Sequence, residues 1–209
     1  MNNNGPFFSV IVPEHNSAEF MRPGLESIRK QTFRDYELII VCDSCEDNTA
    51  EIAREYTDKV FEINAKRCGF ARNKGMDEAR GTWILFMDDD DWFPNENVFR
   101  SIADRAGKDG EDILAFGFEW KGHGYHMNSP KRLYTAVWNK CWRKEFIDRI
   151  GARFPDWKHS DDEGFSRITH HRAQIAYLNE CLYYYNFLRP GSLTWQIENG
   201  LLDKTIPEE

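Results

Sequence analysis

The sequence predicts an α/β fold in which helices flank a mostly parallel β-sheet, with a smaller and less regular second half. Three observations predict it. Through the first hundred residues, short buried-strand patterns alternate with helical patterns, which is typical of parallel βαβ units with right-handed crossovers. Polar loops rich in acidic residues follow these strands. After about residue 112 the pattern becomes irregular and rich in aromatic side chains.

Four strands are predicted in the first half, because four short runs are dominated by β-branched and aromatic residues: 7–13, 36–42, 59–63 and 82–87. Residues 17–32 read as a helix with Phe20, Leu25 and Ile28 on one side. Residues 47–49 offer a cap for a second helix that reaches residue 57. A third helix, 69–80, is expected to end at Gly81. This order of elements indicates a Rossmann-like, nucleotide-binding half.

The second half begins with an alternating run at 113–120, which predicts another strand, and continues through a Gly/His loop at 121–130. The chain has 209 residues, 41% of them hydrophobic, and shows no linker or internal repeat, so the two halves are expected to share one core. The expected division is 1–110 for the first half, 111–195 for the second and 196–209 for a C-terminal tail.

Composition and charge exclude several classes of protein. The net charge of −8 argues against a nucleic-acid partner, because affinity for a phosphate backbone comes mainly from clustered Lys and Arg. No apolar run approaches the roughly 18 to 20 residues that a membrane span needs, and the N-terminal residues lack a signal-peptide pattern. We therefore expect a cytoplasmic protein.

The five cysteines form an odd and scattered set, for which reduced thiols are expected. Cys42 and Cys45 make a CxxC sequence, which is found in redox pairs and in halves of zinc sites. No second CxxC or Cys/His pair stands at zinc-finger spacing. The favoured interpretation is therefore that Cys42 and Cys45 are two small residues in a loop at a strand end.

Ligands of parallel sheets bind beyond the carboxyl ends of the strands, so the residues after each predicted strand are the candidate site residues. They are the segments 13–16, 42–44, 64–67 and 88–91. Three of these four loops carry acidic residues.

Four consecutive aspartates, 88–91, follow the fourth strand. Two like charges about 4 Å apart repel by roughly 4 kcal/mol at an effective dielectric constant of about 20, and a bound cation would remove that cost. Carboxylates suit Mg²⁺ or Mn²⁺, with substrate phosphates completing the shell, or Ca²⁺. Adjacent side chains on an extended backbone point opposite ways, so only some of the four can face an ion.

A solvated acidic turn is the alternative interpretation of the four aspartates. An EF-hand is excluded, because the sixth position has no Gly and the twelfth no Glu.

Other polar residues have both a chemical and a structural interpretation. Asp43 could accept a hydrogen bond from a uracil imide or act in a turn. Arg72 and Lys74 could meet a diphosphate or lie solvated on a helix. The run Ser160-Asp-Asp-Glu163 could supply a carboxylate that takes a proton from an attacking hydroxyl, and it is also a good helix cap.

Several segments of the chain, taken in their order along the sequence, resemble those of family 2 glycosyltransferases with the GT-A fold. The resemblance covers about residues 7–195. The similar segments are Phe8-Ser-Val-Ile-Val-Pro-Glu-His-Asn16, the approach 31–41 to the second strand, Asp43-Ser-Cys-Glu-Asp-Asn-Thr49, Gly69-Phe-Ala-Arg-Asn-Lys-Gly75, and the stretch 81–91, which matches the lead into the DXD motif. Further along, Trp138-Asn-Lys140, Asp161-Asp162-x-x-Phe165 and Arg189-Pro-Gly-Ser192 are similar to later motifs of the family.

The resemblance implies inverting transfer of a sugar from a nucleotide-sugar donor to a glycan or lipid-linked acceptor of bacterial surface-polysaccharide type. The expected donor is a UDP-sugar. It implies Mn²⁺ or Mg²⁺ and peripheral contact with the inner face of a membrane. By position, it implies donor binding by Pro13, Glu14, Asn16, Asp43, Arg72, Asp88 and Asp89, metal ligation by Asp90 and Asp88, and catalysis by Asp162 as the base, with Asp161 as the second candidate.

Three positions depart from the family pattern: Cys42 stands where many members have Asp, His15 where Tyr is frequent, and Asp161 where Glu is common.

Two other functions remain open. A sugar-phosphate nucleotidyltransferase usually carries a Gly-rich, basic loop after the first strand. That loop here is Glu14-His-Asn-Ser-Ala18. The other alternative is an inactive relative that binds nucleotide or glycan.

Overall fold

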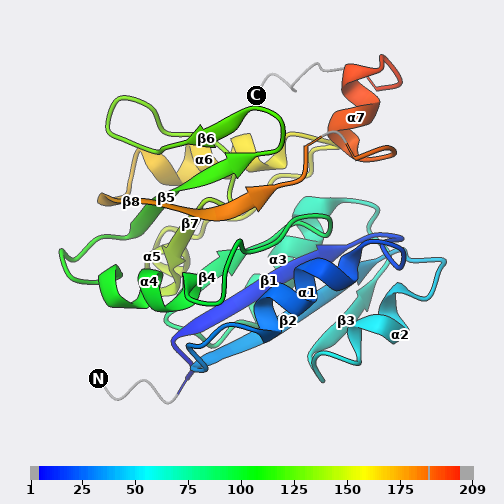
Figure 1. Ribbon diagram of the computed structural model, residues 1–209, viewed down its shortest axis with the longest axis horizontal. Helices are drawn as coiled ribbons and strands as arrows, with labels where there is room; N and C mark the ends of the chain where they lie inside the picture. Colours follow the sequence, from blue (N-terminus) through cyan, green and yellow to red (C-terminus); the bar gives the residue numbers. More distant parts are fainter. Residues whose placement is uncertain (1–4, 188, 203–209) are drawn as a thin grey trace.

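A computed structural model describes residues 5–187 and 189–202 of the chain. Within this range the strands form one sheet, and helices cover both of its faces (Figure 1). The strands are β1 (Phe8–Glu14), β2 (Tyr36–Asp43), β3 (Val60–Ile63), β4 (Trp83–Phe86), β5 (Ile113–Trp120), β6 (Gly124–His126), β7 (Lys140–Arg143) and β8 (Ile175–Tyr185). The helices are α1 (Met21–Arg29), α2 (Thr49–Ala53), α3 (Cys68–Glu78), α4 (Val98–Arg105), α5 (Lys144–Ile150), α6 (Asp161–His170) and α7 (Leu193–Glu198).

The first four strands are parallel and lie in the order β3-β2-β1-β4, which confirms the predicted Rossmann-like half. β1 is the central strand of this group, with Phe8 opposite Tyr36 on one side and opposite Trp83 on the other. All seven residues of β1 are buried. The parallel arrangement places the carboxyl ends of all four strands at one edge of the sheet.

Two helices are shorter than predicted, the first because tertiary hydrogen bonds hold the residues before it and the second because a tighter local turn follows it. The expected helix 17–32 begins at Met21, since the Ser17 N–H donates to Thr49 Oγ1 (2.8 Å) and the Ala18 N–H to Asp47 Oδ2 (3.1 Å). The helix expected to reach residue 57 ends at Ala53, after which a tighter turn follows, in which the Tyr56 N–H donates to the Ala53 carbonyl.

Gly81 has a different role from the helix cap that the sequence predicts. α3 ends at Glu78, and the next residue, Ala79, is already extended, with ψ of 133°. Gly81 instead packs against β1, where a Cβ atom would lie 2.4 Å from the Ser9 nitrogen. Its N–H donates to Ser9 Oγ (2.8 Å). The glycine therefore permits a close approach of two backbones.

Replacing Gly81 by alanine is expected to destabilise the fold by about 1–3 kcal/mol, because backbone atoms of β1 have no free direction in which to move. Urea denaturation measures the change. The control is Gly110→Asn, at an exposed glycine with φ of 73° and nothing within 4 Å, a conformation that asparagine tolerates. Equal stability of the Gly81 variant and the wild type would contradict the packing role.

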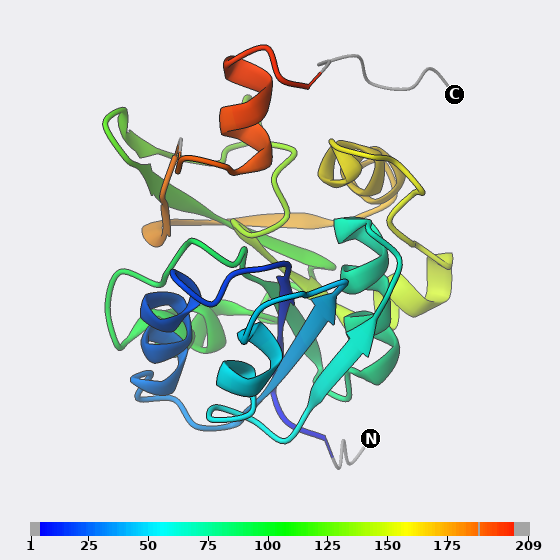
Figure 2. The same ribbon diagram turned by 90° about the vertical axis from the view of Figure 1, so that its right-hand side faces the viewer.

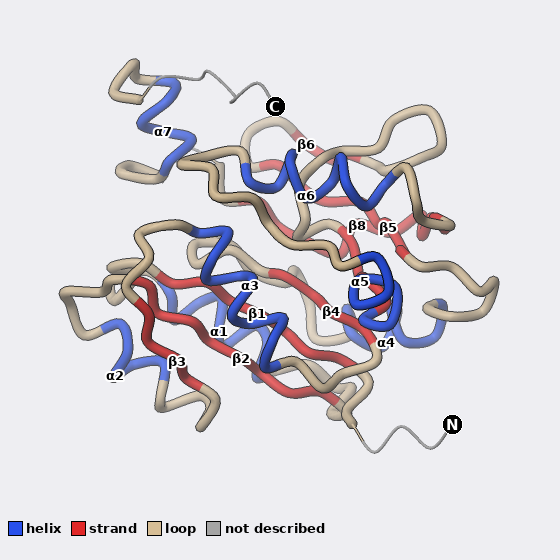
Figure 3. Tube along the Cα trace, turned by 180° about the vertical axis from the view of Figure 1, so that it is seen from behind, coloured by secondary structure: helices blue, strands red, loops and turns tan. Residues whose placement is uncertain are grey.

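Each face of the sheet has its own cluster of buried side chains. On β1, Val10 and Val12 join the cluster that α1, α2 and α4 cover, whereas Ile11 joins the one beneath α3, α5 and α6. Figure 3, drawn from behind, shows α3, α5 and α6 on that second face. Trp142 and Tyr183 are fully buried and pack in the core.

The sheet continues without a break into the second half. β4 pairs with β7 in antiparallel fashion, β7 with β5, and β5 with β8 in parallel. The predicted strand at 113–120 is β5, and the division at residue 110 stays a prediction. The expected tail overlaps α7, which extends to Glu198, and residues 203–209 lie outside the described residues. No helix in the described part of the chain is long and apolar enough to cross a membrane.

Candidate active site

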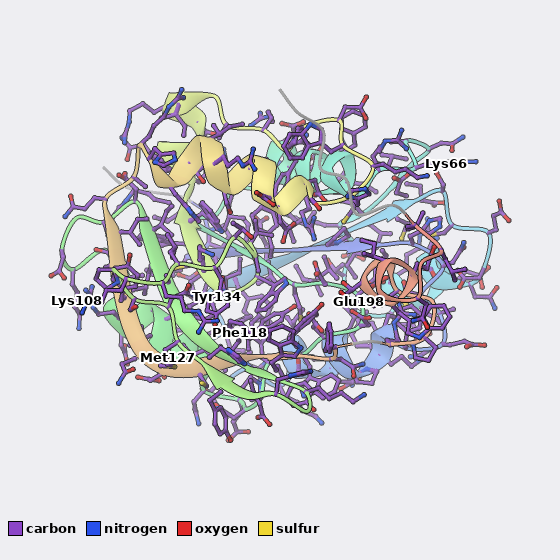
Figure 4. All side chains as sticks on the ribbon, turned by 90° about the horizontal axis from the view of Figure 1, so that it is seen from above. Lys66, Lys108, Phe118, Met127, Tyr134 and Glu198 are labelled. Atoms are coloured by element: carbon purple, nitrogen blue, oxygen red, sulfur yellow. The ribbon has the colours of Figure 1, made fainter. Side chains whose placement is uncertain are left out.

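The ends of the parallel strands gather the predicted site residues. β1 ends at Glu14, β2 at Asp43, and β4 two residues before Asp88. In Figure 2, β2 and β3 point toward the side on which α6 and α7 lie. Figure 4 looks onto this side from above and labels Lys66, in the β3–α3 loop, and Glu198, in α7. Because Arg72 contacts Asp161 of α6 and Arg189 contacts Asp90, the candidate site lies next to α6 and the segment that leads into α7.

Asp43 organises the loop that follows β3. Its Oδ1 accepts the N–H groups of Ala65 (2.7 Å) and Lys66 (2.9 Å), and its Oδ2 accepts the N–H of Arg67 (2.7 Å). Burial acts to raise the pKa of Asp43, but these backbone donors and Ser44 Oγ outweigh it and hold the pKa below its usual value. The carboxylate is ionised at neutral pH, and Oδ2 retains room for one more donor.

The loop after β1 is joined to the loop after β2. His15 Nδ1 lies 2.7 Å from the Asp43 carbonyl oxygen, and Asn16 Oδ1 accepts the Glu46 N–H (2.7 Å). Pro13 and Glu14 are buried, and Glu14 accepts a hydrogen bond from the Ser17 hydroxyl. Burial and the nearby Asp89 carboxylate raise the pKa of Glu14, and its Oε1 atom has no hydrogen-bond partner among the described residues.

The four aspartates after β4 have separate environments. Asp91 is fully buried and supports the turn, because its carboxylate accepts the Tyr183 hydroxyl (2.7 Å) and the Asn186 N–H (2.8 Å). Asp88 pairs with Arg72 and Asp90 with Arg189, at 2.6 and 2.7 Å. Asp89 makes no hydrogen bond or ion pair with a described residue. Burial and the neighbouring Asp90 raise the pKa of Asp89.

Arg72 connects the two halves of the site. Its Nη2 lies 2.6 Å from Asp88 Oδ1, and its Nη1 lies 2.6 Å from Asp161 Oδ2 and 2.9 Å from Asp162 Oδ1. The arginine side chain is 4% exposed. One guanidinium thus compensates three carboxylates from two distant segments, and the surroundings retain a surplus of negative charge.

Asp162 is more accessible than its neighbour, with 22% of its side chain exposed against 9% for Asp161. Both stand in the first turn of α6. Asp162 Oδ2 also accepts the Val137 N–H (3.1 Å). Burial raises the pKa of Asp162 to about 7, although Arg72 opposes the shift. A carboxylate with this pKa is suited to accept a proton at neutral pH.

The donor atoms suit a hard divalent cation. Asp88 and Asp90 are each paired with a guanidinium, and among the described residues no group of three His, Cys, Asp or Glu side chains could hold a metal ion. Acidic side chains nevertheless outnumber Arg72 and Arg189 here. A Mg²⁺ or Mn²⁺ ion bound by one or two carboxylates, with the remaining ligands from a diphosphate, fits this composition.

The structure adds residues to which the sequence analysis gave no role in the site. Asn186 holds Asp91 and Arg189 holds Asp90, both from the segment after β8. Lys140 Nζ is fully buried and donates to the Tyr134 and Ala136 carbonyls, both at 2.6 Å, which fixes the loop that presents the Val137 N–H to Asp162. The signals available in the sequence were the resemblances of Trp138-Asn-Lys140 and Arg189-Pro-Gly-Ser192 to later motifs of the family.

The chain is similar in sequence to known glycosyltransferases over most of its length. The sequence model described as "Glycosyl transferase family 2" matches residues 9–176. The chain belongs to this family. Relatives include putative glycosyltransferase EpsH of Bacillus subtilis, 30% identical over 86% of this chain and 60% of EpsH. Another is the Staphylococcus aureus poly(ribitol-phosphate) beta-N-acetylglucosaminyltransferase TarS, 28% identical over 88% of this chain and 36% of TarS.

Solved structures confirm the predicted GT-A fold. TarS residues 1–349 in complex with UDP-GlcNAc has a TM-score of 0.80 and 25% identity, covering 90% of this chain and 60% of that one. The mannosyltransferase PcManGT of Pyrobaculum calidifontis has a TM-score of 0.71 at 16% identity, covering 93% of this chain and 61% of that one. The chain spans about 60% of the length of the curated relatives EpsH and EpsJ.

Proposed function

We propose that the chain transfers a sugar from a UDP-sugar donor to a hydroxyl of a glycan or lipid-linked acceptor, with inversion and with Mn²⁺ or Mg²⁺. The observation that carries this proposal is the Arg72 contact, which joins Asp88 at the donor edge of the sheet to Asp162 on α6. Family membership and the complexes of TarS with UDP and UDP-GlcNAc support it.

The donor is proposed to bind along the strand ends. Asp43 would accept the imide N–H of uracil through Oδ2, because its other oxygen already has three donors. Pro13, Glu14 and Asn16 would form the wall beside the nucleoside, and Asp89 would meet the ribose or diphosphate. Arg72 would support the site through Asp88 rather than by direct contact, since it is buried and both of its Nη atoms contact carboxylates.

The divalent cation is assigned to Asp88 and Asp90. When bound, such an ion neutralises charge that develops on the leaving nucleoside diphosphate. Arg189, held against Asp90 and over the Phe20 ring at 3.6 Å, would be a second positive group beside the same phosphates. These residues would hold and orient the leaving group.

Asp162 is the proposed base. In an inverting displacement the acceptor hydroxyl attacks the anomeric carbon from the face opposite the leaving group, and a carboxylate removes the hydroxyl proton. The Val137 N–H and Arg72 fix the orientation of Asp162, and its exposed fraction leaves access for an acceptor. Asp161 is mainly a partner of Arg72.

The name of TarS, a poly(ribitol-phosphate) beta-N-acetylglucosaminyltransferase, supports a polymer as the acceptor. The proposal includes a peripheral position at the inner face of a membrane.

The nucleotidyltransferase alternative has no supporting observation, since the loop after β1 lacks glycine and basic residues. The remaining alternative is a relative that binds nucleotide without transfer. It predicts UDP binding with no release of sugar from any donor, and the assay below distinguishes it.

A thermal-shift screen with UDP and GDP, each with and without Mn²⁺, tests the proposed donor and cation together. UDP with Mn²⁺ at about 100-fold above its Kd is expected to raise the Tm by about 5 °C or more, and GDP much less. Asp90→Asn is expected to lose the part of the shift that depends on Mn²⁺. Equal shifts with UDP and GDP, or a shift that ignores Mn²⁺, would count against the assignment. Sugar release from a panel of UDP-sugars then separates an enzyme from a binding protein.

A further inference from the structure

Cys42 and Cys45 lie side by side at the end of β2, with only Asp43 and Ser44 between them. Both are free thiols, and Cys45 packs against the cluster of buried side chains to which Cys42 belongs. Cys42 is 1% exposed and belongs to β2, whereas Cys45 is half-buried in the loop that follows. One thiol is therefore fixed in the sheet, and the other stands on a loop that can move toward it.

Cys45 is accessible to small molecules, because it is half-buried beside a cavity. Both cysteines line a cavity of about 350 Å³ at the ends of β2 and β3, together with Ser44, Asn64 and Lys66. The polar lining admits water and small charged thiols or disulfides. Access of this kind distinguishes the pair from Cys141, which is fully buried in the core.

The surroundings give the two sulfurs different reactivity. The hydrogen bond from the Cys42 thiol, together with the Asn16 N–H, lowers the pKa of Cys45 to about 7, although burial opposes the shift. The same hydrogen bond, burial, and the charges of Glu14 and Glu62 raise the pKa of Cys42. Because the thiolate is the nucleophile in disulfide exchange, Cys45 is the attacking sulfur and Cys42 the resolving one.

We propose that Cys42 and Cys45 form a reversible disulfide by exchange with low-molecular-weight disulfides such as oxidised glutathione. The Cys45 thiolate attacks one sulfur of the small disulfide, which forms a mixed disulfide and releases one small thiolate that takes up a proton. The Cys42 thiol then loses its proton and attacks the Cys45 sulfur, which releases the second small thiolate. The protein loses two electrons and two protons, and the small disulfide is reduced to two thiols.

The disulfide would act on the loop after β1. An S–S bond is about 2.05 Å long, which is shorter than any contact between two sulfurs that are not bonded, so the two sulfurs must move closer together. Cys42 is held between β1 and β3, opposite Glu14 and Glu62, so Cys45 must supply the movement. Cys45 then leaves its contacts with the Glu14 carbonyl (3.6 Å) and the Asn16 N–H. The consequence for UDP rests on the proposed function. If the movement of Cys45 costs the donor site one hydrogen bond, the oxidised protein is expected to bind UDP about fivefold more weakly.

Mass spectrometry after exposure to oxidised glutathione tests the disulfide. The tryptic peptide 35–54, which contains both cysteines, is expected to lose two hydrogens, and dithiothreitol is expected to restore it. Cys42→Ala is expected to trap glutathione on Cys45, whereas Cys45→Ser should leave Cys42 unmodified. Cys68→Ser, outside the pair, should behave as wild type. An unchanged wild-type peptide, or a lasting glutathione adduct on it, would overturn the proposal. Circular dichroism verifies that each variant is folded.

Calorimetry with UDP on the reduced and oxidised wild type tests the link to the donor loop. Lower affinity only in the oxidised protein, with Cys45→Ser unaffected by glutathione, supports the link. Equal affinity in both forms overturns the link. Absence of UDP binding in both forms contradicts the proposed function, while the peptide mass independently decides whether the disulfide forms.

Discussion

Replacing Asp162 by asparagine is expected to lower kcat by about a thousandfold, within the range that a positioned general base contributes. Asparagine keeps the shape and can still accept the Val137 N–H, which lies 3.1 Å from Asp162 Oδ2, but it cannot take up a proton. UDP binding is expected to remain, because Asp162 belongs to the acceptor side. The measurement is the release of UDP from the active donor identified by the sugar panel, alongside calorimetry with UDP.

The pH dependence of kcat provides the second test of this base. Burial raises the pKa of Asp162 to about 7, so the carboxylate is protonated, and inactive as a base, below that pH. The rate is therefore expected to rise through about pH 7 in the wild type and to lose this limb in the variant. Asp161→Asn is the matched control, expected to retain the limb. A profile that disappears in the Asp161 variant instead would reverse the assignment of the base.

The sequence predicts the parallel half of the fold well, because four runs with strand patterns alternate with helical segments. Helix ends were less predictable. The start of α1 depends on hydrogen bonds from Ser17 and Ala18 to residues about thirty positions later, which local periodicity does not contain. The function of Gly81 likewise depends on its contact with Ser9, 72 positions away.

The four aspartates show the same limit within the site. Their clustering predicts a cation, but their separate roles are set by partners far along the chain. Tyr183 and Asn186, which lie 92 and 95 residues from Asp91, make that carboxylate a support for the turn. Arg189, 99 residues from Asp90, comes from a segment quoted only for its resemblance. No local pattern distinguishes a ligand from a support among identical neighbours.

Replacing Arg72 by methionine is expected to destabilise the protein by about 3–5 kcal/mol, the range for removing one partner of a buried ion pair. Methionine fills a similar volume but leaves Asp88, Asp161 and Asp162 without their shared cation. Urea denaturation at pH 8 measures the loss. The control is Arg22→Met, which removes an exposed ion pair with Glu55 and should change stability little.

The destabilisation of the Arg72 variant is expected to shrink as the pH falls from 8 to about 5. Without the guanidinium, which opposes the effect of burial, the folded-state pKa of Asp162 rises further above its unfolded value. The native state then takes up protons in a range where the unfolded chain does not, and this stabilises it relative to the unfolded chain. Adding Asp161→Asn to the variant should recover part of the loss at pH 8, because it removes one uncompensated charge. A loss that is independent of pH and unchanged by Asp161→Asn would show that Arg72 acts through packing against the Phe154 ring, 5.4 Å away, rather than through charge.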